Sequence, residues 1–323
     1  MPRAVFVRRP GGAEVLTVEE HDPGPPGPGH VRIRVAASGV NFIDVYLRTG
    51  LYPRPVPFVL GLEGAGRVEQ VGSGTQRFSV GDRVAWSSVP GSYAGVVLAP
   101  EESLLAVPDA VSDEIAAASM LQGMTAHYLA HSTRTTAPGE TVLVHAAAGG
   151  TGLLLVQLLK RAGATVLGTC STEAKAKLAS EAGCDRVIRY TDEDPAEAAR
   201  AFTEGRGVDV VYDSVGQATF EASLRSLRPR GLLVLFGQSS GPVPPFDLLR
   251  LQAHGSIFVT RPSLVNYTQT REELELRATA ILESVARKDL QIRISATYPL
   301  DQAAEAHQAL EGRRTTGKVL LRP

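Results

Sequence analysis

A run of small residues, Gly149-Gly150-Thr151-Gly152, lies where a phosphate group could bind. The apolar, β-branched residues 141–145 before it predict a buried strand, and the apolar residues 153–161 after it predict a helix. A strand, a tight turn and a helix N-terminus suit a pyrophosphate, because the backbone approaches closely and free N–H groups face the anion. The spacing Ala146-x-x-Gly149-x-x-Gly152 is a variant of the dinucleotide fingerprint with alanine first. A glycine-rich turn without a ligand is the alternative.

The residues after the next predicted strand, 164–169, indicate which dinucleotide would bind. An NAD site carries an acidic residue about 20 residues after the fingerprint, where it accepts hydrogen bonds from the ribose 2′-OH. This chain has Thr169-Cys170-Ser171-Thr172 there, followed by Lys175 and Lys177, and the first acid is Glu173. A hydroxyl and an ammonium hold a 2′-phosphate, which a carboxylate would repel. The sequence therefore predicts NADPH as the cofactor; lysines that only cover a solvated helix face are the alternative.

Length and composition fit two domains and give no sign of a charged partner. The chain has 323 residues, 43% of them hydrophobic, and a formal net charge of −1. This charge favours neither nucleic acid nor an anionic membrane surface. The two cysteines, Cys170 and Cys184, are neither a disulfide framework nor a metal cluster, and no segment has the pattern of a signal peptide or a membrane span. We therefore expect a cytoplasmic protein.

The N-terminal part of the chain is rich in predicted strands and turns. Residues 31–35 alternate apolar and charged side chains, as half-buried strands do, and the Pro/Gly run at 23–29 interrupts regular structure. Many short strands without a helical layer predict a partly open β-barrel. Further strands of this part are predicted at 4–7, 15–18, 61–71, 81–86 and 92–99.

From the predicted strand at 141 to about residue 260, predicted strands and helices alternate. This alternation predicts a doubly wound parallel sheet and hence an α/β protein. Ser112-Asp113-Glu114 has the pattern of a helix N-cap, so two helices, 115–120 and 126–131, are expected to lead into the strand at 141. Further strands are predicted at 187–190, 208–213, 231–237, 256–260, 292–298 and 318–321, and a charged amphipathic helix at 272–289.

Seven segments, in this order and spacing, carry a family resemblance. They are 39–44 (GVNFID), 61–66 (GLEGAG), 81–84 (GDRV), 144–152 (VHAAAGGTG), 211–216 (VYDSVG), 259–263 (VTRPS) and 316–318 (TGK). The chain resembles, over essentially its whole length, the zinc-free, ζ-crystallin-like quinone oxidoreductases of the medium-chain dehydrogenase/reductase superfamily. The resemblance implies a GroES-like barrel domain at 1–124, a Rossmann domain at 125–260 and a return segment at 261–323 that completes the barrel domain. The active site would lie in the cleft between the domains.

The residue types argue against a catalytic zinc ion. The metal-dependent relatives carry a cysteine in the segment that matches 39–44 and a histidine before Glu63. This chain has Asn41 and Leu62 at those places and no four-cysteine cluster. Catalytic zinc needs three side-chain ligands, so we predict no metal. Without a Lewis acid, reduction of an electron-poor quinone or conjugated enone remains feasible, whereas oxidation of an unactivated alcohol does not.

The resemblance also implies roles for individual residues. Asn41 would orient the acceptor oxygen beside the nicotinamide, Tyr46 would stack on the acceptor ring or donate its O–H, and Tyr52 would flank the entrance. No residue is an obvious general acid, so Tyr46 or solvent would protonate the product. A turn asparagine and packed tyrosines are the structural alternatives.

The expected cofactor contacts come from several strand ends. Gly149, Gly150, Thr151 and Gly152 would hold the pyrophosphate, and Ser171, Lys175 and Tyr190 the 2′-phosphate. Ser214, Phe236 and Gly237 end later strands, where ligands of open α/β sheets collect. Phe258 and Thr260 would meet the carboxamide through backbone groups, and Arg313 would add a second cation. The histidines His127, His131, His145 and His254 show no catalytic spacing, and His145 is expected to be a core residue.

The leading hypothesis is an NADPH:quinone oxidoreductase. An enone or enoyl-thioester reductase on the same frame is the near alternative. An NADPH-regulated protein that binds single-stranded RNA or has a structural role is the alternative from another class, although no aromatic–basic stripe supports RNA binding. The resemblance further suggests a homodimer joined through the edges of the Rossmann sheets, near 232–236 or 256–260.

Overall fold

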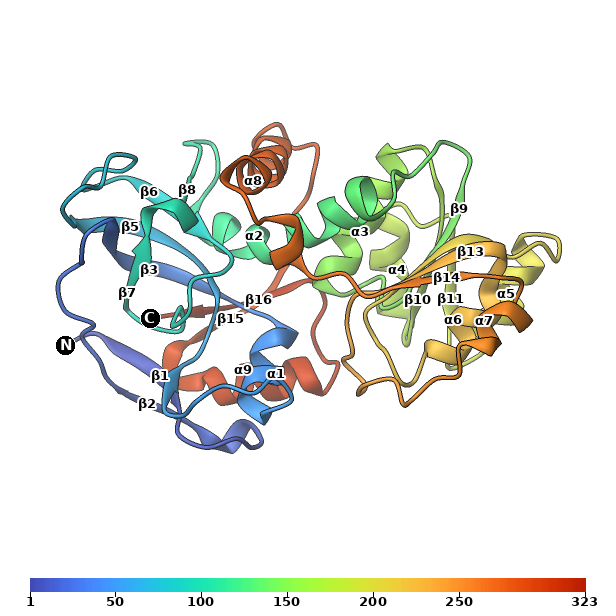
Figure 1. Ribbon diagram of the computed structural model, residues 1–323, viewed down its shortest axis with the longest axis horizontal. Helices are drawn as coiled ribbons and strands as arrows, with labels where there is room; N and C mark the ends of the chain where they lie inside the picture. Colours follow the sequence, from blue (N-terminus) through green and yellow to red (C-terminus); the bar gives the residue numbers. More distant parts are fainter. The chain divides into compact units, whose positions relative to one another are not determined.

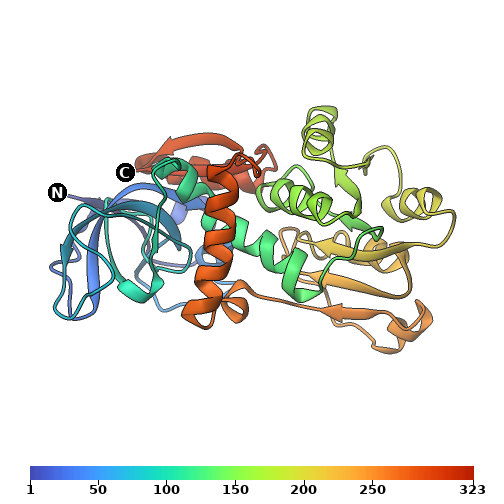
Figure 2. The same ribbon diagram turned by 90° about the horizontal axis from the view of Figure 1, so that it is seen from above.

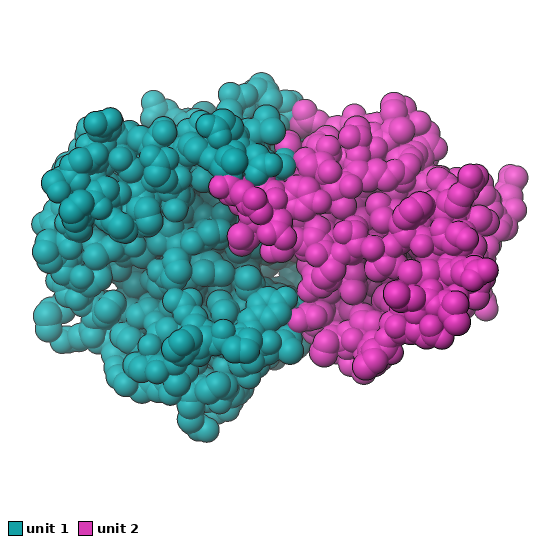
Figure 3. Space-filling view, viewed as in Figure 1, with its two compact units in different colours: residues 1–124, 270–323 teal, residues 125–269 magenta.

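A computed structural model describes all residues, 1–323, and the chain forms two compact units. Unit 1 consists of Met1–Met124 and Thr270–Pro323, and unit 2 of Thr125–Gln269 (Figure 3). The sequence placed the second boundary at 260. The structure places it at Gln269 because the 3₁₀-helix Leu264–Tyr267 still belongs to unit 2, where the Tyr267 ring stacks on Tyr128 with centroids 4.4 Å apart.

Unit 2 contains a six-stranded parallel sheet in the order β11-β10-β9-β12-β13-β14 (Figure 1). Every residue of β9 and β12 is buried, as expected for the central strands of a parallel sheet. The chain order reverses between β9 and β12, so the carboxyl ends of these two strands form the switch point at which such sheets bind ligands. The strands are β9 (Thr141–Val144), β10 (Thr165–Cys170), β11 (Arg186–Arg189), β12 (Val208–Asp213), β13 (Leu227–Leu235) and β14 (Phe258–Thr260).

Five helices accompany this sheet. Helix α3 packs on β9 and β10, α4 on β10 and β11, and α6 on β12 and β13. Side chains such as Leu143, Val211 and Leu233 form the core beneath them. This alternation of parallel strands and helices confirms the predicted doubly wound fold. The helices are α3 (Gly150–Arg161), α4 (Glu173–Glu181), α5 (Pro195–Phe202), α6 (Phe220–Ser226) and α7 (Leu249–Ala253).

Unit 1 contains two sheets whose strand pairings form no closed ring. One has the order β2-β1-β4, and the other has the order β15-β16-β3-β5-β6-β8 with β7 paired to β3. In Figure 1 the C-terminal β16 lies beside β3 from the N-terminal part, as the predicted return segment requires. The strands are β1 (Arg3–Val7), β2 (Leu16–Glu20), β3 (His30–Val40), β4 (Phe58–Val59), β5 (Glu63–Val71), β6 (Arg83–Trp86), β7 (Val96–Pro100), β8 (Leu105–Ala106), β15 (Ile294–Pro299) and β16 (Lys318–Arg322).

Unit 1 also contains helices, and one of these helices, α2, differs from the prediction. The two helices expected at 115–120 and 126–131 are a single helix, α2 (Asp113–Tyr128), continued by a π-helical turn at Leu129–Thr133. No proline interrupts this stretch, and Gly123 lets α8 cross α2 closely, since a Cβ there would lie 2.9 Å from Ile281 Cγ2 (Figure 2). The other helices are α1 (Phe42–Thr49), α8 (Arg271–Ala286) and α9 (Ala303–Glu311), with 3₁₀-turns at Ala13–Val15, Glu101–Ser103 and Leu300–Gln302.

One of the two outer strands of the parallel sheet is β14. Its Phe258 and Val259 side chains are exposed, by 61% and 40%. The predicted dimer edge near 232–236 is wrong, because β13 pairs with both β12 and β14 and has no free edge. None of the helices is long and apolar enough to span a membrane.

Candidate active site

The predicted phosphate loop begins directly after β9. Ala146 adopts a φ of 52°, which turns the chain sharply, and Gly149 N–H donates to its carbonyl at 2.9 Å. No side chain caps α3, and the first helical N–H with a backbone acceptor is that of Leu153, bonded to Gly149 O at 2.9 Å. The N–H groups of the run Gly150-Thr151-Gly152 therefore stay free to bind an anion at the positive end of the helix dipole.

Gly152 allows the close packing of this loop on α3. A Cβ at this position would lie 2.3 Å from Ala146 O and 2.9 Å from Ala147 Cα. These are backbone atoms, so a side chain could be accommodated only if the loop moved away from the helix. The last glycine of the fingerprint thus has the packing role that a dinucleotide site requires.

Three further predicted residues meet at the carboxyl ends of β12 and β13. Ser214 follows β12, and Phe236 N–H donates to Asp213 O at 2.8 Å. Gly237 lies so close that a Cβ would stand 2.5 Å from Ser214 O. Thr260 ends the neighbouring β14 and belongs to the same edge, whereas Phe258 begins that strand opposite Leu232 and lies away from it.

The expected 2′-phosphate residues follow β10 and β11. Tyr190 N–H donates to Cys170 O at 3.1 Å, which places Ser171 and Tyr190 after adjacent strand ends. Lys175 lies in the first turn of α4, and its charge acts on Cys170, as does that of Arg189. Burial nevertheless raises the pKa of the Cys170 thiol.

Sequence reasoning named Tyr190 at the end of β11 but missed its neighbour Arg189, because the cations for the 2′-phosphate were taken only from the residues after β10. Its guanidinium contacts Glu173 at 3.3 Å and Asp192 at 2.5 Å. These ion pairs are exposed and therefore weak. Arg189 and Lys175 together form a cationic pair at this strand end.

A buried network ties the loop to the middle of the sheet. His145 Nδ1 lies 3.0 Å from Thr169 Oγ1, and its Nε2 lies 3.1 Å from Ser223 Oγ, which donates to Asp213 Oδ2 at 2.7 Å. The carboxylate bonds to the serine and not to the histidine, so the order of a hydrolase triad is absent. Burial lowers the pKa of His145, and the residue is a core histidine as predicted.

The second group of predicted residues lies in unit 1, around Asn41. Its Nδ2 donates to Glu63 Oε2 at 2.7 Å and to Gly39 O at 3.2 Å. Its Oδ1 accepts from Lys318 Nζ at 2.8 Å and from Gln122 Nε2 at 3.2 Å. Because Lys318 can only donate and the carboxylate can only accept, the amide orientation is fixed. We call Asn41, Glu63, Gln122 and Lys318 the amide cluster.

The amide cluster changes the role expected for Asn41. Both of its amide hydrogens are bound by protein acceptors, so it is not the free donor to an acceptor oxygen that the sequence suggested. Sequence reasoning missed Gln122 and Lys318, which come from α2 and β16. The pattern TGK at 316–318 marked Lys318 as a family feature, but no sequence pattern pointed to Gln122.

The tyrosines expected beside Asn41 pack against each other. The rings of Tyr46 and Tyr52 meet edge to face with centroids 5.2 Å apart, and Phe42 lies 6.1 Å from Tyr46. Tyr46 is buried on α1, whose N-cap is Asn41, and Tyr52 is half-buried in the loop that follows. Arg313, also in unit 1, is exposed after α9 with a φ of 55°.

A second buried hydrogen-bond network, formed around Asp44, holds α1 in place. Asp44 Oδ2 accepts from Asn41 N–H and from Tyr93 O–H, both at 2.8 Å, whereas Oδ1 is buried without a partner. Burial raises the pKa of Asp44 to about 7. Burial also lowers the pKa of His307 to about 3, and the Arg48 guanidinium 3.0 Å from its Nδ1 acts in the same direction.

These two shifts predict opposite pH dependences of stability. Between pH 3.8 and 7 folding adds a proton to Asp44, and between pH 6.5 and 3 it removes one from His307, so the two effects cancel over the shared range. In His307→Gln, the free energy of unfolding should fall as pH rises from about 4 to 7, by up to about 1.4 kcal/mol per pH unit. In Asp44→Asn, it should fall as pH decreases below about 6.5. Urea unfolding of both variants across this pH range measures how the free energy of unfolding changes with pH. Slopes of the same sign in both variants would refute the two pKa assignments.

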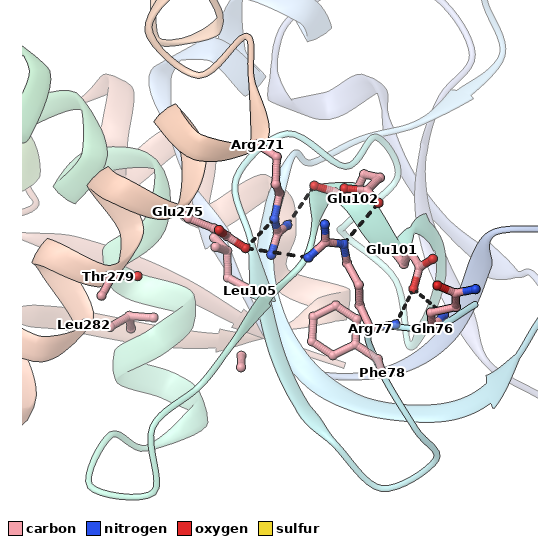
Figure 4. Close-up of a pocket in the computed structure, with 11 residues that line it drawn as sticks. Gln76, Arg77, Phe78, Glu101, Glu102, Leu105, Arg271, Glu275, Thr279 and Leu282 are labelled. Carbon is pink, nitrogen blue, oxygen red and sulfur yellow. Dashed lines mark hydrogen bonds and ion pairs between the residues drawn. The ribbon is translucent and has the colours of Figure 1, made fainter. Parts of the chain in front are cut away.

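A cavity of about 710 Å³ in unit 1 lies away from these residues. Figure 4 shows that Arg271 and Arg77 project into it, each paired with a carboxylate: Arg271 Nε lies 2.7 Å from Glu275, and Arg77 Nε lies 3.1 Å from Glu102. Its charges are mutually satisfied, and none of the predicted site residues lines it. No group of three or more His, Cys, Asp or Glu side chains is placed to hold a metal ion.

Comparison with known proteins agrees with this architecture and confirms the predicted fold class. Models of an alcohol dehydrogenase GroES-like domain and of a zinc-binding dehydrogenase match residues 27–109 and 150–278. The quinone oxidoreductase of Pseudomonas aeruginosa is 47% identical over 97% of both chains, and the 2-haloacrylate reductase of a Burkholderia species 43% over 100% of this chain and 99% of its own. The crystal structure of Escherichia coli quinone oxidoreductase complexed with NADPH is 42% identical, with a TM-score of 0.97 over 99% of this chain and 100% of that one. The chain therefore belongs to the zinc-free quinone oxidoreductases of the medium-chain dehydrogenase/reductase superfamily.

Proposed function

We propose that this protein is an NADPH-dependent reductase that passes a hydride to a quinone without the help of a metal ion. Two features together carry the proposal. The N-terminus of α3, which follows the Ala146 turn, has no side-chain cap. The residues that follow β10 offer hydroxyl and cationic groups and no buried carboxylate. The first feature suits a pyrophosphate and the second a 2′-phosphate. The NADPH in the E. coli relative supports the same cofactor.

The residues divide into two proposed roles. In unit 2, the run Gly149-Gly150-Thr151-Gly152 would bind the pyrophosphate, and Ser171, Lys175, Arg189 and Tyr190 the 2′-phosphate. Ser214, Phe236, Gly237 and Thr260 would line the nicotinamide half. In unit 1, Tyr46 and Tyr52 would offer aromatic faces to a flat acceptor, and Arg313 would add a cation for the cofactor. Bound NADPH supplies the hydride; the protein binds and orients both partners.

A conjugated carbonyl is the second candidate acceptor. The relative named 2-haloacrylate reductase, 43% identical over the whole chain, favours it. Both acceptors are electron-poor and take up hydride without a Lewis acid.

An NADPH oxidation assay with 1,4-benzoquinone, a cyclic enone and 2-chloroacrylate tests the proposal. We expect at least one acceptor to be reduced, with kcat/KM for NADPH higher than that for NADH by on the order of 10-fold or more. Failure with all three acceptors would contradict the reductase function. Tight binding of single-stranded RNA at moderate salt would instead favour the non-enzymatic alternative.

We also propose a cytoplasmic homodimer joined through the β14 edge, without a nucleic-acid partner. The exposed Phe258 and Val259 on an unpaired strand support the dimer, because such edges pair readily. Sedimentation of the wild-type protein should give a mass twice that of one chain. The variant Val259→Lys should give the mass of the monomer. A monomeric wild-type protein would refute this arrangement.

A further inference from the structure

The amide cluster has one member whose polar atoms are not all bound by protein. Asn41, Glu63 and Lys318 are exposed by at most 3%, whereas Gln122 is half-buried. One N–H of Gln122 donates to Asn41 Oδ1 at 3.2 Å, which leaves its second amide N–H and its carbonyl oxygen without a protein partner. The cluster therefore presents a single amide outward from a buried polar base.

The buried base holds that amide in one orientation. Lys318 Nζ contacts Glu63 Oε2 and lies 2.8 Å from Asn41 Oδ1, and Leu121 N–H donates to Glu63 Oε1 at 2.7 Å. Asn41 must therefore turn its oxygen toward Gln122. A buried ion pair costs desolvation and persists only where its geometry is good, and it can specify one arrangement.

The absence of a side chain at Gly39 leaves room for the buried Glu63 and Lys318 side chains. A Cβ on Gly39 would lie 2.2 Å from Glu63 Oε2 and 2.7 Å from Lys318 Cε. Gly39 has no left-handed φ, so glycine is required here for room and not for backbone freedom. The ion pair is thus built into β3, β5 and β16 together.

We propose that Gln122 donates its second amide N–H to the carbonyl oxygen of the acceptor, with Asn41 and Lys318 as its positioning residues. This inference rests on the proposed reductase function. The hydride brings two electrons to the acceptor carbon, the conjugated π electrons move to the carbonyl oxygen, and that oxygen takes a proton from solvent while NADP⁺ remains. A fixed donor that faces the developing oxyanion stabilises the transition state, and one such donor contributes about 10²–10³-fold to kcat.

Gln122→Glu and Gln122→Leu test the donor directly. Both substitutions lie on a half-buried side chain, so we expect folded proteins. The kcat for a cyclic enone should fall by about 10²-fold in Gln122→Leu and by more in Gln122→Glu, whose carboxylate repels the oxyanion. The kcat for a strongly oxidising quinone should fall less, because its anion is already delocalised. Gln70→Glu, which makes the same charge change at an exposed position of β5, should leave both rates unchanged.

4-Nitrophenol gives a readout that does not require turnover. It resembles the anionic product state, and its absorbance reports ionisation. Bound to the wild-type protein with NADP⁺, its pKa should lie about one unit below its value in water, and Gln122→Glu should raise it above that value. Gln122→Leu should return the pKa toward the value in water.

The positioning role is tested in Lys318→Met combined with Glu63→Gln, which leaves no unpaired buried charge. The double variant should fold, bind NADPH as the wild type does, and lose part of the enone kcat and of the nitrophenol shift. Arg48→Met removes an equally buried cation of the same unit, which pairs with Glu311 at 2.8 Å, and should lower stability without changing the nitrophenol pKa.

The outcomes separate this inference from the proposed function. A wild-type protein that reduces no acceptor contradicts the function. An active protein whose enone kcat and nitrophenol pKa do not change in either Gln122 variant overturns the inference alone.

Discussion

Replacing Gly152 by alanine should weaken NADPH binding on the order of 100-fold, which corresponds to about 2.7 kcal/mol. Even a single methyl group would stand 2.3 Å from Ala146 O, so the loop must move away from the start of α3. The pyrophosphate would then lose its aligned N–H donors and part of the helix dipole. Fluorescence titration with NADPH measures the change in Kd.

The matched control for this variant is Gly27→Ala. A Cβ on Gly27 meets nothing within 4 Å, and its φ is not in the left-handed region. This variant should bind NADPH like the wild type. An unchanged Kd in Gly152→Ala would mean that the loop does not bind the cofactor.

Removing the cationic pair after β10 and β11 should abolish the preference for NADPH. In Lys175→Ala/Arg189→Ala, the Kd for NADPH should rise by about 10- to 100-fold, because the two exposed cations, each weakened by solvent screening, together contribute about 1.5–3 kcal/mol. The Kd for NADH should change little, since it has no 2′-phosphate. Isothermal calorimetry with both cofactors measures this difference.

Lys177→Ala is the control for the charge change. Lys177 is on the same helix, and its side chain is 77% exposed and 3.9 Å from Glu181. It should leave both affinities as they are. Equal losses for NADPH and NADH in the double variant would remove the assignment of a 2′-phosphate site to this strand end.

Local patterns made the nucleotide half of the molecule predictable. The buried strand, the small-residue turn and the helix are contiguous in sequence, so the loop around Gly152 could be located directly. The parallel sheet also follows from the alternation of strands and helices, because parallel strands need crossover connections. Arg189 escaped prediction because it becomes a neighbour of Ser171 only when β11 pairs with β10.

The amide cluster could not be predicted in the same way. Asn41 lies between β3 and α1 and the other members come from β5, α2 and β16, so strand pairing and packing bring them together only in the folded chain. Lys318 would ordinarily be assigned to the surface, since buried lysines are rare. The aromatic contact between Tyr46 and Tyr52 was easier to anticipate because it lies within one helix and its following loop.

The prediction of two helices in place of α2 was wrong for a physical reason. Residues 113–128 are rich in alanine, and tertiary packing against α8 continues the helix through a stretch that local signals divided in two. Gly123 provides the close approach of the two helices.

Calorimetric titration of the wild-type protein with NADPH and with NADH tests the central claim most directly. The claim is that the uncapped start of α3 and the cations after β10 and β11 hold a dinucleotide with a 2′-phosphate. NADPH should bind at one site per chain, with an affinity higher than that of NADH by on the order of 10-fold or more. The absence of any heat with NADPH, or equal affinities for both, would contradict it.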